Sequence, residues 1–177
     1  KWRTPFNTFL LSHAATSGGD YTEGNAWQYT WHVQHDVEGL IDLFGGKEKF
    51  ANKLDSLFFL ESSAENTGFT QDVTGLIGQY AHGNEPGHHT VYLYSYAGLQ
   101  WKTAEKVDYI LSQMYHDSPD GLQGNEDCGQ MSSWYVFSSL GFYPVNPSNG
   151  IYVFGRPIFD KVALKLPENK VFEIRTV

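Results

Sequence analysis

Three short stretches of the chain place acidic side chains between turn-forming residues and the start of an apolar segment. They are residues 124–134 (Gly-Asn-Glu-Asp-Cys-Gly-Gln-Met-Ser-Ser-Trp), residues 83–86 (Gly-Asn-Glu-Pro) and residues 23–27 (Glu-Gly-Asn-Ala-Trp). Burying an apolar core does not require such an arrangement. Paired carboxylates can donate and accept protons during bond cleavage. We therefore predict an acid/base site where three carboxylates meet: Glu23, Glu85 and Asp127.

Each acidic stretch comes immediately before a predicted helix. Helix N-termini carry a partial positive charge and free N–H groups, which favour ionised carboxylates and bound hydroxyls. The alternative is that Asp and Glu are common at helix starts as capping residues, and for a single stretch this alternative is the stronger one. Three stretches of related form, each followed by aromatic residues or histidines, favour a functional interpretation.

Histidines on both sides of the stretch at 83–86 invite a metal-site interpretation. His82 and the pair His88 and His89 flank Glu85, but the spacing differs from the His-Glu-x-x-His pattern of zinc sites. Pro86 separates His82 from the helix predicted to carry the other two. The surroundings are rich in oxygen, which suits Ca²⁺ better than Zn²⁺. The later pair could instead bind a substrate hydroxyl, or be satisfied residues at a helix start.

Cys128 is the single cysteine, and it directly follows Asp127. A nucleophilic role has to be considered, but neighbouring carboxylates disfavour the thiolate. We expect a small buried residue at this position. One cysteine also excludes an internal disulfide.

The composition excludes several classes of function. The chain has 177 residues, 41% of them hydrophobic, which is enough to bury a core. Its formal net charge is −8 and it lacks a basic cluster, so nucleic-acid binding is not expected. A run of roughly 18 apolar residues, as a membrane span needs, is not present. The aromatic content of 16% supplies flat rings that build cores and also stack on sugars.

The first residues, Lys-Trp-Arg-Thr-Pro, show no start-like or leader-like pattern. We therefore expect a piece of a larger protein that lacks its N-terminal region.

Apolar residues recur at helical spacing through most of the chain. Short breaks between such segments, as at the glycine pair 45–46, are typical of antiparallel helical hairpins. Helix signals begin after Asn25, and apolar faces at helical spacing predict helices at 33–44, 47–58, 86–98, 103–115 and 129–140, with loops at 4–21 and 62–74. The recurring hairpins predict a mainly α fold, part of an α/α toroid. In a toroid the inner helices run in one direction, so the three carboxylates would face a common funnel.

The pattern changes to strands near residue 143. Residues 151–154 are apolar, and 162–166 and 171–177 alternate with the period of a half-buried strand around a turn at 167–170. A two-stranded hairpin is barely stable alone. We expect it to dock on the helices or on a sheet outside this chain.

Two carboxylates across a funnel lined with Trp and Tyr suit glycoside hydrolysis. One protonates the leaving oxygen, and the other takes a proton from water or attacks directly. The sequence has no Gly-x-Ser-x-Gly elbow, phosphate loop or dinucleotide fingerprint that would favour another reaction.

Four motifs in order resemble glycoside hydrolase family 92, whose members are calcium-dependent, inverting exo-α-mannosidases. The motifs are residues 20–29, 83–89, 124–132 and 140–144, and the likeness covers nearly the whole chain. The resemblance implies an N-terminal β-sandwich and a catalytic (α/α)6 barrel. Residues 1–142 would be part of that barrel, and residues 143–177 a C-terminal β segment that returns to the sandwich. The remainder of the parent chain would complete both.

The resemblance also implies roles for individual residues. Glu23 would be the general acid and Asp127 the general base. Asn84 and Glu85 would help hold Ca²⁺, which would grip mannose hydroxyls and act as a Lewis acid. The substrate pocket would contain Trp27, Gln28, His88, His89, Asn125 and Glu126.

Two positions bear on the substrate. Some relatives carry Asp where this chain has Asn125, so a second carboxylate beside the base is an amide here. Relatives with Gln at the acid position act on mannosyl phosphate, so Glu23 favours a glycosidic leaving group.

We expect a periplasmic or secreted enzyme acting on α-1,2-linked mannose of N-glycans or mannan, with little or no activity in these residues alone. The alternatives are another linkage specificity and a non-catalytic glycan-binding or structural fragment.

Overall fold

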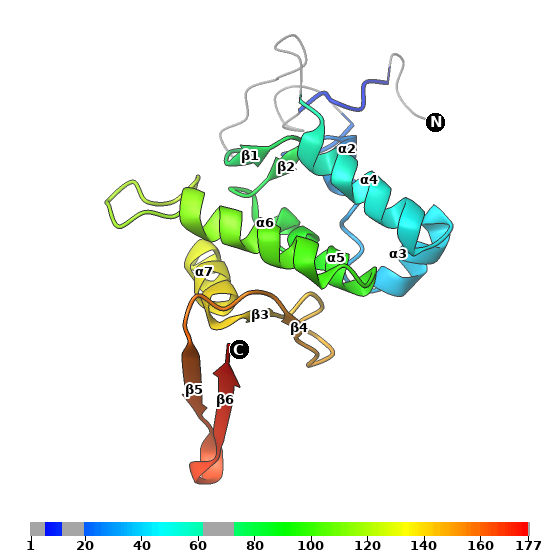
Figure 1. The fold of residues 1–177 in the computed structure, drawn as a ribbon. Helices are drawn as coiled ribbons and strands as arrows, with labels where there is room; N and C mark the ends of the chain where they lie inside the picture. The colour runs from blue at the N-terminus through cyan, green and yellow to red at the C-terminus, as the bar shows by residue number, and fades with distance from the viewer. Residues whose placement is uncertain (1–5, 12–19, 62–72, 177) are drawn as a thin grey trace.

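The structure, a computed structural model, describes residues 6–11, 20–61 and 73–176 (Figure 1). A helical body carries short two-stranded antiparallel sheets. Most of the loop predictions at the N-terminus and at 62–74 lie outside the described residues. Within the described ranges, no helix has the length and apolar character needed to cross a membrane.

Two consecutive helices form the predicted hairpin, but its first helix begins at Val37 and not at residue 33. Asp36 caps its first helix by accepting a hydrogen bond from the backbone N–H of Gly39 at 2.9 Å, so Val33 lies in the preceding turn. Gly45 ends that helix in the left-handed conformation, with φ 83°. The elements are α2 (Ala26–Tyr29), α3 (Val37–Phe44) and α4 (Lys47–Phe59), and α3 packs on α4 as predicted.

The segment predicted as one helix at 86–98 is instead a series of short turns. Residues 88–94 are all buried, and a single α-helix on a protein surface buries only one face. Pro86 lies in the first turn, and bonds between residues three apart make the turns 3-10. The elements are β1 (Leu76–Ile77), β2 (Tyr80–Ala81), η2 (Glu85–Gly87), η3 (Thr90–Tyr92) and α5 (Leu93–Tyr96).

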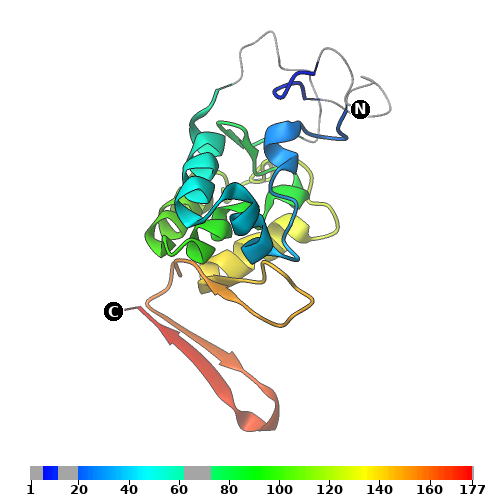
Figure 2. The same ribbon diagram turned by 90° about the vertical axis from the view of Figure 1, so that its right-hand side faces the viewer.

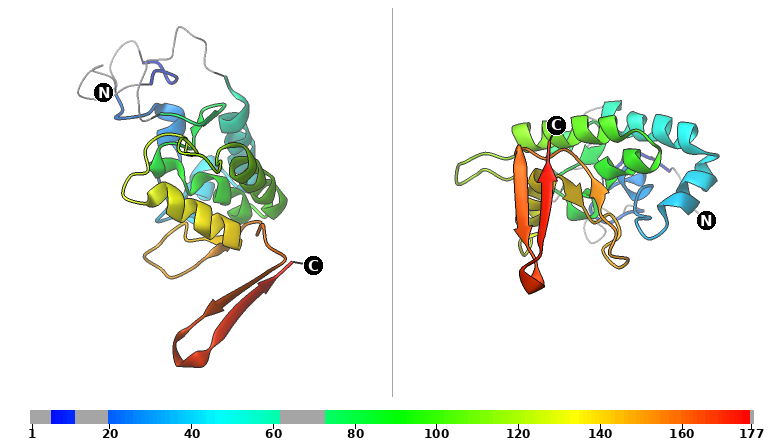
Figure 3. Two further views of the ribbon diagram at one scale, coloured as in Figure 1. Left: turned by 90° about the vertical axis from the view of Figure 1, so that its left-hand side faces the viewer. Right: turned by 60° about the horizontal axis from the view of Figure 1, so that its bottom comes forward.

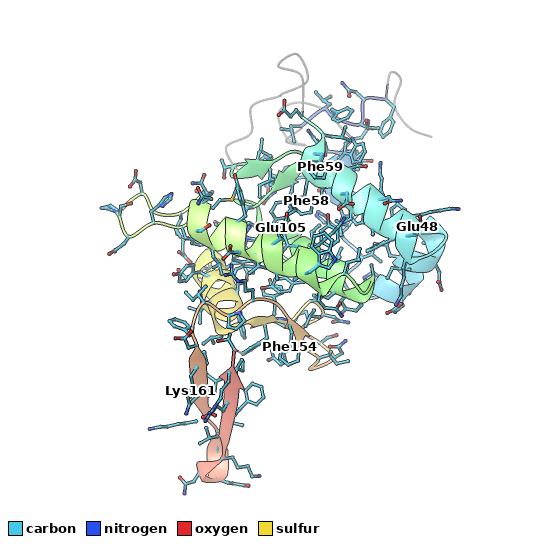
Figure 4. The ribbon with its side chains drawn as sticks, in the orientation of Figure 1. Glu48, Phe58, Phe59, Glu105, Phe154 and Lys161 are labelled. Carbon is cyan, nitrogen blue, oxygen red and sulfur yellow. The ribbon has the colours of Figure 1, made fainter. Side chains whose placement is uncertain are left out.

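Two longer helices complete the body close to their predicted positions, namely α6 (Gln100–Gln113) and α7 (Gln130–Leu140). Helix α6 packs on α5, η3 and α7. Adjacent residues at the end of α4 separate core from surface, because Phe58 is buried and Phe59 is 74% exposed (Figure 4). The fully buried aromatic core includes Trp31, Phe50, Tyr80, Tyr92, Tyr94 and Trp134.

The C-terminal region leaves the helical body as a hairpin that projects from it (Figures 2 and 3). The hairpin was predicted, and its register pairs Val162 with Ile174. A second small sheet returns the chain to the end of α7. The elements are β3 (Phe142–Tyr143), β4 (Val153–Phe154), β5 (Lys161–Lys165), η4 (Pro167–Asn169) and β6 (Val171–Arg175), with β3 paired to β4 and β5 to β6.

Candidate active site

Two of the three acidic stretches meet at their glycines. A Cβ on Gly83 would collide with the Thr74 side chain and with the Gln123 carbonyl. Gly124 has φ 98°, and a Cβ there would lie 2.6 Å from Thr74 Oγ1 and 3.1 Å from the Gly83 carbonyl oxygen. Thr74 Oγ1 also donates a hydrogen bond to the Gln123 carbonyl at 3.2 Å. The absence of side chains at both glycines therefore lets the two acidic segments approach each other.

Asn84 connects these two stretches to the third. Its Nδ2 donates a hydrogen bond to the backbone carbonyl of Glu23 at 2.8 Å. Glu23 comes just before α2, whose buried N-cap Asn25 accepts hydrogen bonds from the N–H groups of Trp27 and Gln28. The start of α2 and the start of η2 are thereby held together.

The three predicted carboxylates interact, and the effect is largest on Glu85. Burial raises the pKa of Glu85, and so does its hydrogen bond to the Asp127 side chain. The negative charges of Asp127 and Glu23 raise it further, to about 7. Among the residues that the structure describes, Glu85 Oε1 is buried and has no hydrogen-bond partner. Glu85 is thus the carboxyl group on which both of the others act.

Glu23 and Asp127 both stand in the left-handed backbone region, with φ 51° and 45°. Cys128, with φ 57°, continues that conformation after Asp127. Such a conformation costs a residue other than glycine on the order of 1–3 kcal/mol, and it persists where surrounding contacts enforce it. The remaining positive-φ residues of this kind in the described chain lie at the tip of the C-terminal hairpin.

His88 and His89 are buried and bonded to the protein. The Nε2–H of His88 donates to the His82 carbonyl at 2.9 Å, and its Nδ1 lies 3.2 Å from Gln130 Nε2. The Nε2–H of His89 donates to the Trp31 carbonyl at 2.7 Å. Burial lowers the pKa of both rings to about 4, so both are neutral at pH 7. Neither nitrogen of His88 is left open to a sugar hydroxyl.

A buried chain of hydrogen bonds beneath the site was missed in the sequence. Tyr80 Oη lies 2.9 Å from His82 Nδ1, and His82 Nε2 lies 2.8 Å from Tyr115 Oη, which donates to the Met131 carbonyl at 3.3 Å. The His82 ring meets the Trp134 ring edge-on at 4.4 Å. Burial holds the pKa of His82 well below its usual range. The available signal was the spacing of Tyr80 and His82, two residues apart at a strand end.

The side chains of Trp27 and Gln28 both make contacts with other residues of the chain. The Lys53 ammonium lies 3.3 Å from the centroid of the Trp27 ring, and the Phe9 ring packs on it at 5.6 Å. Those contacts compete with sugar stacking on this ring. Gln28 accepts a hydrogen bond from the backbone N–H of the α2 N-cap at 2.9 Å and donates to the Gln79 carbonyl at 3.0 Å.

The last predicted positions lie on the loop before α7. Asn125 is exposed. Both carboxylate oxygens of Glu126 accept hydrogen bonds from Ser132. Cys128 is exposed, which corrects the expectation of a buried residue, because the loop carries it at the surface just beyond Asp127.

Two adjoining hollows lie at Glu23 and Glu85, and Pro86 lines both, whereas Asp127 lines neither. The first is lined by Glu23, Gln28, Trp31, His32, Tyr80 and Asn84 among others. The second is lined by Glu85, His89, Gln130, Trp134, Phe137 and Tyr143, together with the proline-containing loop at 144–147. The arrangement can place a sugar beside ionisable carboxylates and aromatic rings.

Comparison with known proteins assigns this arrangement to a family. The family model for the glycosyl hydrolase family 92 catalytic domain matches residues 1–177. The chain belongs to glycosyl hydrolase family 92. Two structures of a family GH92 α-mannosidase from Bacteroides thetaiotaomicron, one in complex with mannoimidazole, are 43% identical over 99% of this chain, with TM-scores of 0.84 and 0.86.

Two further relatives extend the comparison within family 92 and beyond bacteria. A family GH92 inverting mannosidase from Bacteroides thetaiotaomicron VPI-5482 is 40% identical over 99% of this chain, with a TM-score of 0.78. A protein of the fungus Arthroderma benhamiae, described as an uncharacterized secreted glycosidase, is 32% identical over 88% of this chain. The chain spans 22–24% of the three bacterial structures and 18% of the fungal protein.

The surroundings of Glu85 fit the hard cation that the family 92 resemblance implies. Its buried Oε1 needs a partner, and the nearby carboxylates add negative charge. Asn84 brings an amide, and Ca²⁺ prefers carboxylate and amide oxygens. In the described part of the chain, no group of three or more His, Cys, Asp or Glu could hold a metal alone. Additional ligands would have to be amide or carbonyl oxygens, water, substrate or other parts of the protein.

Proposed function

We propose that this chain is the C-terminal part of an inverting exo-α-mannosidase. The observation that carries the proposal is Glu85, which shares a hydrogen bond with Asp127 and also feels the charge of Glu23. Three carboxylates from distant segments thus gather in one place in a chain of family 92. The relatives described as α-mannosidases and as an inverting mannosidase support the same reaction class.

In this proposal, Glu23 is the general acid and Asp127 the general base. Glu23 would protonate the leaving oxygen, while Asp127 would take a proton from the attacking water on the opposite face of the sugar. Asp127 is exposed, so water can reach it. Asn84 holds the backbone of Glu23 and so fixes the acid relative to Glu85.

Asn84 and Glu85 would hold Ca²⁺. When bound, the cation would supply a Lewis acid that stabilises charge on the mannose hydroxyls. A cation would also lower the electrostatic cost of keeping Glu85 ionised beside Asp127 and Glu23. His89 and Gln28 would act at the pocket wall, where they line the two hollows.

The architecture proposed for the whole protein is a catalytic (α/α)6 barrel with an N-terminal β-sandwich. Residues 1–142 would supply part of the barrel, in keeping with the hairpin of α3 and α4. Residues 143–177 would return to the sandwich, in keeping with the projecting β5–β6 hairpin. A periplasmic or secreted location is supported by the fungal relative, which is described as secreted.

The proposed substrate is α-1,2-linked mannose of N-glycans or mannan. Glu23, a group that can donate a proton, favours a glycosidic leaving group over a phosphate. A mannosidase of another linkage is the nearest alternative, and a panel of α-linked mannobioses assayed with the full-length protein distinguishes them.

The central test is the hydrolysis of α-1,2-mannobiose by the full-length protein and its variants. Glu23→Gln and Asp127→Asn should each lower kcat by about 10²-fold or more. A mannoside with a good leaving group should restore the rate of the Glu23 variant but not that of the Asp127 variant, because only the acid assists departure. Glu105→Gln, which removes an exposed carboxylate from α6, is the control.

Two further measurements accompany these rates. Proton NMR should show β-mannose as the first product, and a chelator should abolish activity until Ca²⁺ is restored. Rates within a factor of a few of wild type in both carboxylate variants would show that the assignment is wrong.

The second candidate is a non-catalytic glycan-binding or structural fragment. The exposure of Asn125 and Asp127 in this chain favours it for the isolated residues. Calorimetry with mannose and Ca²⁺ separates residual binding from none.

A further inference from the structure

We propose that Glu126 is a positioning residue, which holds Asp127 in place by clamping its loop onto the first turn of α7. This inference rests on the proposed function, because it takes Asp127 as the general base. It replaces the expectation that Glu126 contacts the substrate.

The clamp consists of contacts between Glu126 and the third residue of α7. Glu126 Oε1 accepts a hydrogen bond from the Ser132 backbone N–H at 3.0 Å, and Oε2 accepts one from Ser132 Oγ at 2.9 Å. The backbone carbonyl of Glu126 also accepts from the Met131 N–H at 3.3 Å. Glu126 therefore binds the helix through its side chain and its backbone.

Helix α7 depends on these contacts because it lacks an ordinary cap. Its N-cap is Gly129, which has φ 88° and no side chain to accept a hydrogen bond. The first N–H groups of a helix need acceptors from outside the helix, and a negative charge near them is favourable. Glu126 supplies both, from three residues before the N-cap.

The ring closed by the clamp contains the strained backbone of the base. Asp127, Cys128 and Gly129 have φ values of 45°, 57° and 88°, and all three lie between Glu126 and the start of α7. Strained conformations persist only when surrounding contacts enforce them. Opening the ring would let these residues relax toward negative φ, and Asp127 would shift relative to Glu85.

The side chain of Glu126 is also placed for this role and not for sugar binding. Both carboxylate oxygens of Glu126 are occupied by Ser132, and Glu126, like Asp127, lines neither of the hollows described above. Its partner Ser132 lines a different hollow, beside Tyr115 and Tyr135. The carboxylate of Glu126 is thus used within the protein, at the start of α7.

The test uses the full-length protein with the variants Glu126→Gln and Ser132→Ala. The first replaces one acceptor by an amide, and the second removes only the hydroxyl. Each should lower kcat for α-1,2-mannobiose on the order of 10-fold, with KM changed less than about 2-fold, because misplacing a catalytic group costs rate more than binding. Ser132→Thr keeps the hydroxyl and should restore most of the rate. The matched controls are Glu105→Gln, which removes an exposed carboxylate from α6 (Figure 4), and Ser112→Ala, which removes an exposed hydroxyl from the same helix.

A double variant separates positioning from a general structural effect. If Glu126 acts through Asp127, adding Glu126→Gln to Asp127→Asn should cause no further loss of kcat beyond about 2-fold. Equal, additive losses in both backgrounds would overturn the proposal, as would unchanged kcat in Glu126→Gln and Ser132→Ala. Wild-type activity in Asp127→Asn would instead overturn the proposed function. Melting temperatures identify any variant that loses rate by unfolding. In that case, the rate of Ser132→Thr relative to Ser132→Ala still shows whether the hydroxyl is needed for catalysis.

Discussion

The carboxylate rim, defined as Glu23, Glu85 and Asp127, differs from the histidine layer beneath it, defined as His82, His88 and His89. The rim is partly or fully exposed, and two of its members have strained backbones. The layer is buried, and each ring is hydrogen-bonded to the protein. Members of both come from one stretch, residues 82–89.

One short stretch, residues 82–89, therefore carries both a carboxyl group beside like charges and buried, neutral rings. The negative charges of Asp127 and Glu23 disfavour ionisation of Glu85, whereas His88 and His89 are neutral at pH 7 and hydrogen-bonded to the protein. Sites that carry out chemistry are commonly less stable than their surroundings, which have to compensate. A buried, neutral and hydrogen-bonded layer of this kind can support the strained backbones and like charges of the rim. Substitutions in the histidine layer should therefore lower the stability of the protein, whereas removing a charge from the rim should raise it.

The largest effect on stability is expected from His82→Ala in the layer. It would leave a cavity against Trp134 and remove the hydrogen-bond partner of Tyr80 and Tyr115. The expected loss is about 3–4 kcal/mol, seen as a fall of the melting temperature of roughly 3 °C in the full-length protein, because the shift per kcal/mol becomes smaller as the chain becomes longer. His116→Ala, at an exposed histidine after α6, is the matched control. An equal, small change in both variants would mean that the layer does not stabilise the site.

An effect of intermediate size is expected from acidification. His88 and His89 have pKa values of about 4 in the folded protein and about 6.5 when unfolded. The unfolded state therefore binds more protons below pH 6.5, and stability falls as pH drops from 6.5 toward 4. Each ring should contribute roughly 2 kcal/mol of loss between pH 7 and pH 5.

Thermal midpoints at the two pH values measure this loss. His82, whose pKa burial also holds well below its usual range, contributes in the same sense. Replacing one ring by a residue that does not titrate, as in His89→Asn, should therefore reduce the loss of stability between pH 7 and pH 5 by the share of that ring, roughly 2 kcal/mol. Glu85 has a raised pKa and contributes in the opposite sense, so wild type and variant have to be compared in identical buffers containing chelator. A pH dependence unchanged by the substitution would show that His89 is not the titrating group.

The positions of most helices, and the gathering of the three acidic stretches, could be predicted because the signals for them lie within short segments of the sequence. The period of apolar residues locates α4 and α7 nearly to the residue, and the alternation at 162–166 locates the hairpin. The grouping of Glu23, Glu85 and Asp127 followed from residue type and from the shared glycine–asparagine pattern. The glycines at 83 and 124 then bring two of the stretches together in space.

The roles of the neighbouring side chains could not be predicted because burial and hydrogen bonding depend on distant segments. His88 looks the same in sequence whether it faces a sugar or the His82 carbonyl. Trp27 is covered by Lys53, which lies on another helix. The segment at 86–98 failed as a helix because seven successive residues, 88–94, are buried, and no periodicity records that.

The smallest effect, and one of opposite sign, is expected from Glu85→Gln in the rim. The substitution keeps the shape of the side chain and removes a charge that burial, Asp127 and Glu23 all oppose. Without divalent cations, at pH 8, the melting temperature of the full-length protein should rise by about 2 °C. Added Ca²⁺ should stabilise the wild type more than the variant, since a ligand that binds only the folded state raises its stability. Glu105→Gln should change neither value. A lower melting temperature for Glu85→Gln in chelator would mean that Glu85 supports the fold as the histidine layer does, and the distinction between rim and layer would fail at this residue.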